Sequence, residues 1–181
     1  YYCKQNCGAK SNVVTIDIGG GTTDVYVVEG NVPKILSSFR FAANAIFGDG
    51  YNFASSTNGF VKTFQNEIYS ILKSNNAVAG VSDILHAYDA IMKLDNSNDK
   101  IALFFSLSTN KTIKEKAIPI DFLLILSQND KFKYVFIIFY GAILYYVANM
   151  MKAKNLSLPQ TLAFSGNGSK TLGVLSPNKA T

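Results

Sequence analysis

Residues 13–24 have the sequence Val-Val-Thr-Ile-Asp-Ile-Gly-Gly-Gly-Thr-Thr-Asp, and this stretch decides the fold. An apolar segment ends in three glycines and two threonines, and a second apolar segment, Val25 to Val28, follows at once. The pattern predicts two β-strands joined by a tight turn, with apolar side chains on one face of the first strand. Asp17 and Asp24 then flank the turn.

The composition of this turn favours binding of phosphate and a hydrated cation. Glycine lacks a Cβ atom, so its backbone can adopt positive φ and approach a ligand closely. Successive N–H groups in such a turn form a site for anions, and the hydroxyls of Thr22 and Thr23 add donors. Magnesium prefers one or two carboxylates, retained waters and phosphate oxygens, which suits Asp17 and Asp24. The alternative is a plain β-hairpin, although a tight hairpin needs only two turn residues.

Two familiar nucleotide motifs do not fit this stretch. A dinucleotide fingerprint needs Gly-x-Gly-x-x-Gly, and its last position, counted from Gly19, falls on Asp24. A Walker A loop needs Gly-Lys followed by Ser or Thr, which this turn lacks.

Length and composition indicate one well-buried domain with at most a small addition. The chain has 181 residues, of which 48% are hydrophobic and 16% charged. Residues 131–181 hold six lysines and no acidic residue, but the lysines are scattered among apolar residues. The only arginine is Arg40, so bidentate recognition of phosphate or guanine is scarce. We therefore expect no nucleic-acid partner.

The N-terminal segment carries two cysteines, Cys3 and Cys7, and the chain has one histidine. Cysteine and histidine alone cannot complete a four-ligand zinc site, and a disulfide framework is equally unsupported. The segment has no apolar core of signal-peptide length, so we expect a cytoplasmic protein. The first residue is not methionine, which indicates a fragment.

Periodicity and turn residues predict the remaining elements. A third strand, Val32 to Phe41, completes an antiparallel meander. Further along we expect helices over 53–73, from about 82 to 94, over 118–126 and over 130–154, strands over 101–107 and 161–164, and a polar turn over 109–116. Capping residues are expected at Ser82, Asp83 and Asp130.

The segment from Tyr134 to Met151 contains no charged residue. Its eighteen residues make a borderline transmembrane candidate. Gly141, Asn149 and four tyrosines make it less lipophilic than a typical span. We expect a buried helix of an α/β domain and no membrane crossing.

Two other loops are rich in small residues. Gly48-Asp49-Gly50 precedes a predicted helix, whose N-terminus could meet a phosphate. Ser165 to Lys170 follows a predicted strand and leaves room for a flat ring or a sugar, with hydrogen bonds from Asn167 and Ser169. The alternative for both is an ordinary strand-to-helix connection.

The segment Ile16 to Asp24 resembles the second phosphate motif of the superfamily of actin, sugar kinases and seventy-kilodalton heat-shock chaperones. Ser165 to Lys170 looks like that superfamily's adenosine motif, with Asn167 interrupting the usual glycines. Gly48-Asp49-Gly50 resembles the chaperones' Gly-Gly loop. The three features occur in the order that this superfamily has.

The resemblance implies a role for each matching residue. The β- and γ-phosphates of ATP or ADP would be contacted by Gly19, Gly20, Gly21, Thr22 and Thr23. Asp17 and Asp24 would orient Mg²⁺ through water. Gly166, Asn167 and Gly168 would face the adenosine, with Lys170 nearby. No catalytic residue is assigned to this chain.

The implied fold is an α/β, ribonuclease-H-like lobe. It consists of an antiparallel three-stranded meander extended by a further strand and packed by helices. Residues 13–73 and 131–176 would form its core, and residues 74–130 a small inserted subdomain that contacts a protein partner.

The implied function is that of the second lobe of an actin-like or chaperone-like ATPase. Only twelve residues precede Val13, so the family's first phosphate motif and first lobe lie outside this sequence. Phosphoryl transfer needs contacts on all sides of the phosphate, so this chain alone would be inactive although its parent protein is an ATPase. The alternatives are a filament or scaffold protein controlled by nucleotide, a small-molecule kinase of the same fold, and a degenerate lobe that binds only a partner.

Overall fold

The computed structural model describes residues 12–47 and 54–176. Cys3, Cys7 and the Gly48-Asp49-Gly50 loop lie outside the described residues. Contacts divide the chain into two compact units. The first comprises the described residues up to 46 together with 134–176, and the second is built from residues 47–133.

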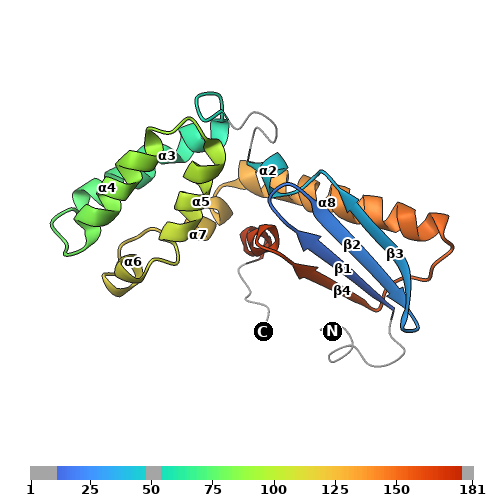
Figure 1. The fold of residues 1–181 in the computed structure, drawn as a ribbon. Coiled ribbons are helices and arrows are strands. Elements are labelled where there is room, and N and C mark those ends of the chain that lie inside the picture. Colours follow the sequence, from blue (N-terminus) through green and yellow to red (C-terminus); the bar gives the residue numbers. More distant parts are fainter. Residues whose placement is uncertain (1–11, 48–53, 177–181) are drawn as a thin grey trace. The chain divides into compact units, whose positions relative to one another are not determined.

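The first unit is built on a mixed sheet of four strands (Figure 1). The strands are β1 (Val13–Ile18), β2 (Thr23–Glu29), β3 (Val32–Phe39) and β4 (Thr161–Ser165). Their order is β3-β2-β1-β4, with β1, β2 and β3 antiparallel and β4 parallel to β1. The predicted α/β class and the meander extended by a further strand are thus confirmed.

One face of this sheet is apolar and covered by helix α8 (Asp130–Ala153). Val14, Ile16 and Ile18 of β1 are fully buried on that face. The α8 side chains that pack inward are Phe136, Phe139, Tyr140, Ile143, Val147 and Met151. The opposite face carries more exposed side chains, including Asp17, Asp24, Tyr26 and Leu36. This alternation follows from the period of two in a strand.

Among the described helices, only α8 is long and apolar enough to be a candidate membrane span. Its length and its mean hydropathy of 1.6 would allow it to cross a membrane. One such helix is weak evidence of membrane crossing, because a core helix of a soluble protein passes the same test. A third of the apolar segment of α8 is buried inside the protein, which is less than the sequence-based expectation of a buried helix.

Short segments complete the first unit. Helix α2 (Ala43–Ile46) follows β3, and a 3₁₀ helix, η1 (Gly168–Val174), follows β4. The hydroxyl of Tyr140 and Oγ1 of Thr171 lie 2.7 Å apart, so a buried hydrogen bond joins α8 to η1.

The regular secondary structure in the described part of the second unit is all helical. It contains α3 (Gly59–Ser74), α4 (Val81–Met92), α5 (Ser97–Leu107), α6 (Lys111–Glu115) and α7 (Phe122–Ser127). Phenylalanine rings in edge-on and tilted contacts fill its interior, with centroids 4.8 to 5.4 Å apart, namely Phe47, Phe60, Phe64, Phe104, Phe105, Phe122 and Phe132. Such contacts contribute beyond the burial of area alone.

The predicted strand over residues 101–107 is wrong, because this segment lies in α5. The side chain of Asn96 caps the helix by accepting hydrogen bonds from the N–H groups of Asn98 and Asp99. Ile101, Phe104 and Leu107 are buried at a spacing of three residues, which is helical. The polar turn expected over 109–116 likewise contains α6.

Several predicted helix starts also need correction. α3 begins at Gly59, where Asn58 accepts a hydrogen bond from the N–H of Val61. α4 begins after Gly80 without any side-chain cap, so Ser82 and Asp83 do not cap it. At α8 the capping acceptor is Asn129, whose Oδ1 receives hydrogen bonds from the backbone of Lys131 and Phe132.

The contact-based division does not coincide with the expected boundary at residue 73/74. Helix α3 packs against α4 and α5, so it belongs with the helical unit. Residues 47–73 therefore join the segment that was expected to form the insertion.

The aromatic interior of the helical unit is expected to dominate its stability. Phe122→Ala should lower the free energy of unfolding by about 3–5 kcal/mol, because it opens a cavity among packed rings. Leu124→Ala, on the same helix but about half exposed, should change it by less than about 0.5 kcal/mol. Urea denaturation followed by circular dichroism measures both, and equal losses would contradict this account.

A pH dependence should arise at Asp95. Its carboxylate accepts hydrogen bonds from the Ser55 hydroxyl (2.8 Å) and from the backbone of Ser55 and Ser56, which lower its pKa from the ordinary 3.8. A depressed pKa gives stability that is complete above the ordinary value and is lost as pH falls through the folded-state value. Wild type should therefore lose more stability between about pH 5 and pH 2 than Asp95→Asn. Urea titrations of both proteins at both pH values test this assignment. Equal losses of stability in the two proteins would contradict it.

Candidate functional site

The turn between β1 and β2 is held from one side by α2. Gly19 closes the turn by donating its N–H to the carbonyl of Thr22 (2.9 Å). The carbonyls of Gly19 and Gly20 accept hydrogen bonds from the N–H groups of Ala43 (3.2 Å) and Asn44 (2.8 Å). Within the described ranges, the N–H groups of Gly20 and Gly21 donate to no backbone acceptor. They are therefore available to a ligand, while the carbonyl groups of Gly19 and Gly20 are engaged.

The glycines of the turn were expected to adopt positive φ, but they do not. None of Gly19, Gly20 and Gly21 lies in the left-handed region. A Cβ atom at Gly19 would lie 3.2 Å from the carbonyl oxygen of Thr22, a tight contact. A Cβ atom at Gly20 would make only ordinary contact with Asn44, 3.5 Å away, and one at Gly21 would meet nothing within 4 Å. The fold itself therefore does not require glycine at positions 20 and 21.

The two predicted carboxylates lie directly opposite each other. Asp17 of β1 pairs with Asp24 of β2, so both side chains project from the same exposed face of the sheet. Neither forms an ion pair with any residue that the structure describes. Like charges directly opposite each other on a sheet are destabilising. A bound cation would relieve that repulsion.

Serine side chains extend this pair into a row across the sheet. Ser38 of β3 is the neighbour of Asp24, and Ser165 of β4 is the neighbour of Asp17. Together Ser38, Asp24, Asp17 and Ser165 form what we call the cross-sheet row. All four are exposed, so the row offers oxygen atoms next to the glycine turn.

The second small-residue turn packs directly on the end of β1. Gly166 has φ of +81°, and a Cβ atom there would collide with Oδ1 of Asp17 and the carbonyl of Ile18. A Cβ atom at Gly168 would lie 2.6 Å from Cγ2 of Ile18. The packing of the fold therefore explains why glycine occupies both positions. The contact brings Asp17 together with the segment that was predicted to face adenosine.

The polar residues of this second turn differ in how far they are engaged. Ser169 donates its hydroxyl to the carbonyl of Gly166 (2.7 Å). Asn167 and Lys170 are exposed, and Lys170 forms no ion pair within the described residues. Asn167 and Lys170 are thus the two members of the predicted adenosine set whose side chains remain accessible.

The two threonines of the first turn are not equivalent. Thr22 is exposed, whereas Thr23 is fully buried and donates its hydroxyl to the carbonyl of Phe41 (2.6 Å). A hydroxyl has one proton to donate, so that of Thr23 is directed into the fold. Thr22 is the hydroxyl that is free to donate to a ligand.

The carboxylates of Asp17 and Asp24 are the side chains beside the turn that could hold a cation. Among the described residues no group of three or more histidine, cysteine, aspartate or glutamate side chains converges. Two carboxylates completed by water and by oxygen atoms of a ligand suffice for Mg²⁺. Asp17 and Asp24 would hold such an ion, with the turn beside it.

Comparison with known proteins adds no assignment, because no protein-family model and no curated protein sequence matches the chain.

Sequence reasoning missed the support from α2 and the serines of the row. Ala43 and Asn44 carry no recognisable motif, because they act through backbone N–H groups. Ser38 could have been found from the predicted meander, since its pairing with Asp24 follows once the strand register is known.

The glycines provide a matched test of this site. Gly166→Ala should destabilise the protein by more than about 1 kcal/mol, because of its positive φ and the collision with β1. Gly21→Ala should leave the free energy of unfolding unchanged or raise it by up to about 1 kcal/mol, because alanine restricts the unfolded chain. Urea denaturation distinguishes them. A marked loss of stability in Gly21→Ala would show that the fold needs this glycine.

Proposed function

We propose that this chain is the second nucleotide-binding lobe of an actin-like ATPase, and that its glycine turn binds the β- and γ-phosphates of ATP or ADP. The observation that carries the proposal is the exposed turn itself. Gly20 and Gly21 are needed neither for φ nor for packing, and alanine at such a position would stabilise the fold by about 0.4–1 kcal/mol by restricting the unfolded chain. Close approach of a ligand to the backbone accounts for their presence.

The electrostatics of the site support a ligand that combines anion and cation. The N–H groups of Gly20 and Gly21 attract a phosphate, while Asp17 and Asp24 repel one unless a cation lies between them. A magnesium–nucleotide complex supplies both charges. Asp17 and Asp24 would bind the hydrated ion through its waters, and the Thr22 hydroxyl would donate to a phosphate oxygen.

The sheet topology supports the ribonuclease-H-like form of the proposal. A meander of three antiparallel strands, extended by a strand parallel to the first, is the arrangement that the superfamily resemblance implies. Because β1 and β4 are parallel, their carboxyl ends lie at the same edge, and the turns after both strands meet there. Asn167 and Lys170 would then contact the adenosine, with Gly166 and Gly168 shaping the backbone.

The proposed lobe forms one side of the site. The remaining phosphate contacts would come from a first lobe that this sequence does not contain. Phosphoryl transfer depends on positioning and charge stabilisation around the whole phosphate. The chain alone should therefore bind nucleotide weakly and should not hydrolyse it. Residues 74–130 of the helical unit would carry the surface for a protein partner.

Nuclear magnetic resonance of the chain labelled with nitrogen-15 tests this function. Mg-ADP, titrated to millimolar concentration, should shift the amide signals of Gly20, Gly21 and Thr22 first, because their N–H groups contact the phosphates. Replacing Mg²⁺ by paramagnetic Mn²⁺ should broaden the signals of Asp17 and Asp24. Mg²⁺ without nucleotide serves as the reference titration.

Two variants and one control sharpen this test. Asp24→Asn and Gly20→Val should each weaken the response at the turn about tenfold or more, since one removes a metal ligand and the other blocks close approach. Gly59→Ala, whose added Cβ would meet nothing within 4 Å in the helical unit, should respond like wild type. Unchanged amide signals at the turn, or equal responses from all variants, would overturn the proposed site.

A further inference from the structure

Tyr140 joins helix α8 to both sides of the second small-residue turn. The side chain is buried, and its residue is 4% exposed. Its ring packs edge-on against Phe164, a β4 residue just before the turn, with the ring centroids 5.8 Å apart. Its hydroxyl lies 2.7 Å from Oγ1 of Thr171, which belongs to η1 after the turn. One side chain of α8 therefore contacts the segments that enter and leave this turn.

The two buried hydroxyls form a chain of hydrogen bonds that ends on the backbone of the turn. Oγ1 of Thr171 donates to the carbonyl oxygen of Gly168 (2.7 Å). Because a hydroxyl has one proton to donate, the Thr171 oxygen then accepts from Tyr140. Burial raises the pKa of Tyr140 above its ordinary value of 10.0, so this hydroxyl keeps its proton at neutral pH. The direct distance from the Tyr140 hydroxyl to the Gly168 carbonyl is longer, at 3.3 Å.

Gly168 also lies against the end of β1 and the first glycine turn. A Cβ atom at Gly168 would lie 2.6 Å from Cγ2 of Ile18 and 3.0 Å from the carbonyl oxygen of Gly19. The backbone at Gly168 is thus fixed between the glycine turn and the chain of hydroxyls. Asn167 and Lys170 are exposed and flank this fixed point. Their placement beside the glycine turn therefore depends on the hydroxyl chain.

We propose that Tyr140 is a positioning residue for the adenosine part of the nucleotide, because its hydroxyl holds the segment that carries Asn167 and Lys170. This inference rests on the proposed function. The glycine turn that would bind the phosphates is instead held by hydrogen bonds from α2. Groups that are not held in place must be ordered when the ligand binds, which weakens binding. Loss of the Tyr140 hydroxyl should therefore weaken the contacts to adenosine and spare those to the phosphates.

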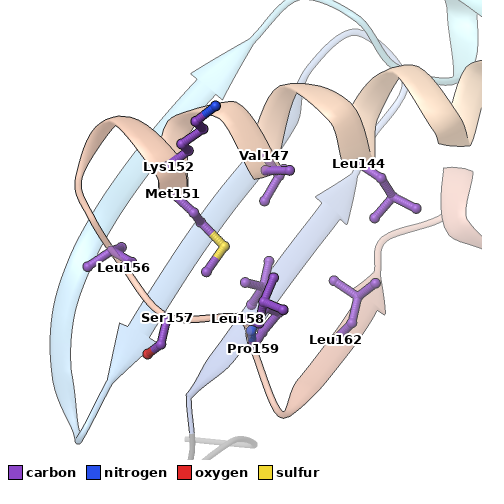
Figure 2. Close-up of a pocket in the computed structure, with 11 residues that line it drawn as sticks. Leu144, Val147, Met151, Lys152, Leu156, Ser157, Leu158, Pro159 and Leu162 are labelled. Carbon is purple, nitrogen blue, oxygen red and sulfur yellow. The ribbon is translucent and has the colours of Figure 1, made fainter.

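An apolar pocket farther along α8 is the alternative place for the adenine ring. Its volume is about 530 Å³, and it lies between α8, the loop from Leu156 to Pro159 and Leu162 of β4 (Figure 2). Its size is within the range of pockets that bind small molecules. Its lining residue Val14 precedes the glycine turn by five positions, roughly 17 Å along a strand, and lies on the sheet face opposite Asp17. This separation favours η1 over the pocket.

Nuclear magnetic resonance titrations with Mg-ATP and with Mg-tripolyphosphate, which lacks adenosine, test the inference. The amide shifts of Gly20 and Gly21 give a dissociation constant for each ligand. In Tyr140→Phe the constant for Mg-ATP should rise about threefold to tenfold, as for one hydrogen bond, while that for Mg-tripolyphosphate stays within about twofold of wild type. The variant keeps the ring that packs on Phe164. A merely structural role would change both constants or neither.

A second variant and two controls sharpen this test. Thr171→Val removes the other hydroxyl at similar size and should show the same selective loss of Mg-ATP. The double variant should be no weaker than either single one, because both changes break one chain. Tyr145→Phe removes a hydroxyl from α8 at a residue that is 74% exposed, and Leu158→Ala changes a pocket residue that is 88% exposed. Both controls should bind the two ligands like wild type.

The remaining outcomes separate this inference from the proposed function. If wild type binds both ligands and Tyr140→Phe either binds Mg-ATP equally well or weakens for both ligands alike, the positioning role is overturned and the phosphate site stands. A loss of Mg-ATP affinity in Leu158→Ala would assign the adenine ring to the pocket instead. If the turn signals of wild type respond to neither ligand, the proposed function fails and the positioning role fails with it.

Discussion

The parallel pairing of β1 with β4 is the constraint on which the candidate site depends. It places Ser165 beside Asp17, and the chain then turns at Gly166 so closely over β1 that no side chain fits. Two segments separated by more than 140 residues thereby meet at one edge of the sheet. Without this pairing, β1 would be an edge strand of the three-stranded meander, and the turn after β4 would not meet the glycine turn.

The α2 segment supplies a second constraint on the same turn. It binds the carbonyls of Gly19 and Gly20, and Thr23 is tied to Phe41 just before it. The turn is thus held through groups that a phosphate would not use, and the N–H groups of Gly20 and Gly21 stay available. Preorganisation of this kind is what an anion site needs, because the donors need not be ordered when the ligand binds.

Local patterns in the sequence predicted the sheet well. The alternation in Val13 to Ile18 gave the buried face of β1, and the pairing of Asp17 with Asp24 followed from a tight turn between two strands. Local patterns did not show contacts that act over long range or through the backbone. The hydroxyl of Thr23 was expected to donate to phosphate, but it is directed to Phe41. Gly166 was predicted to face adenosine, which stays a prediction, and its conformation also serves packing on Asp17 and Ile18.

The helical unit was the part least predictable from sequence. Residues 101–107 are apolar and aromatic, which favours a strand by composition. This segment nevertheless forms α5, because Asn96 caps the first turn of the helix and the buried residues recur at helical spacing. Within the described ranges, asparagine caps four helix starts, at Asn58, Asn96, Asn110 and Asn129. These caps indicate the helices more clearly than the apolar composition does.

The central claim is that Asp17 and Asp24 are opposed in order to hold a cation with a phosphate ligand, at a cost to stability. Urea unfolding of wild type and Asp24→Asn, each with and without millimolar Mg-ADP, tests it most directly. Without ligand, Asp24→Asn should be as stable as wild type or more stable by about 0.2–1 kcal/mol, because one of two like charges is removed. With Mg-ADP, only wild type should gain stability, since ligand that binds the folded state stabilises it. A less stable Asp24→Asn without ligand, or an equal gain in both proteins, would contradict the account.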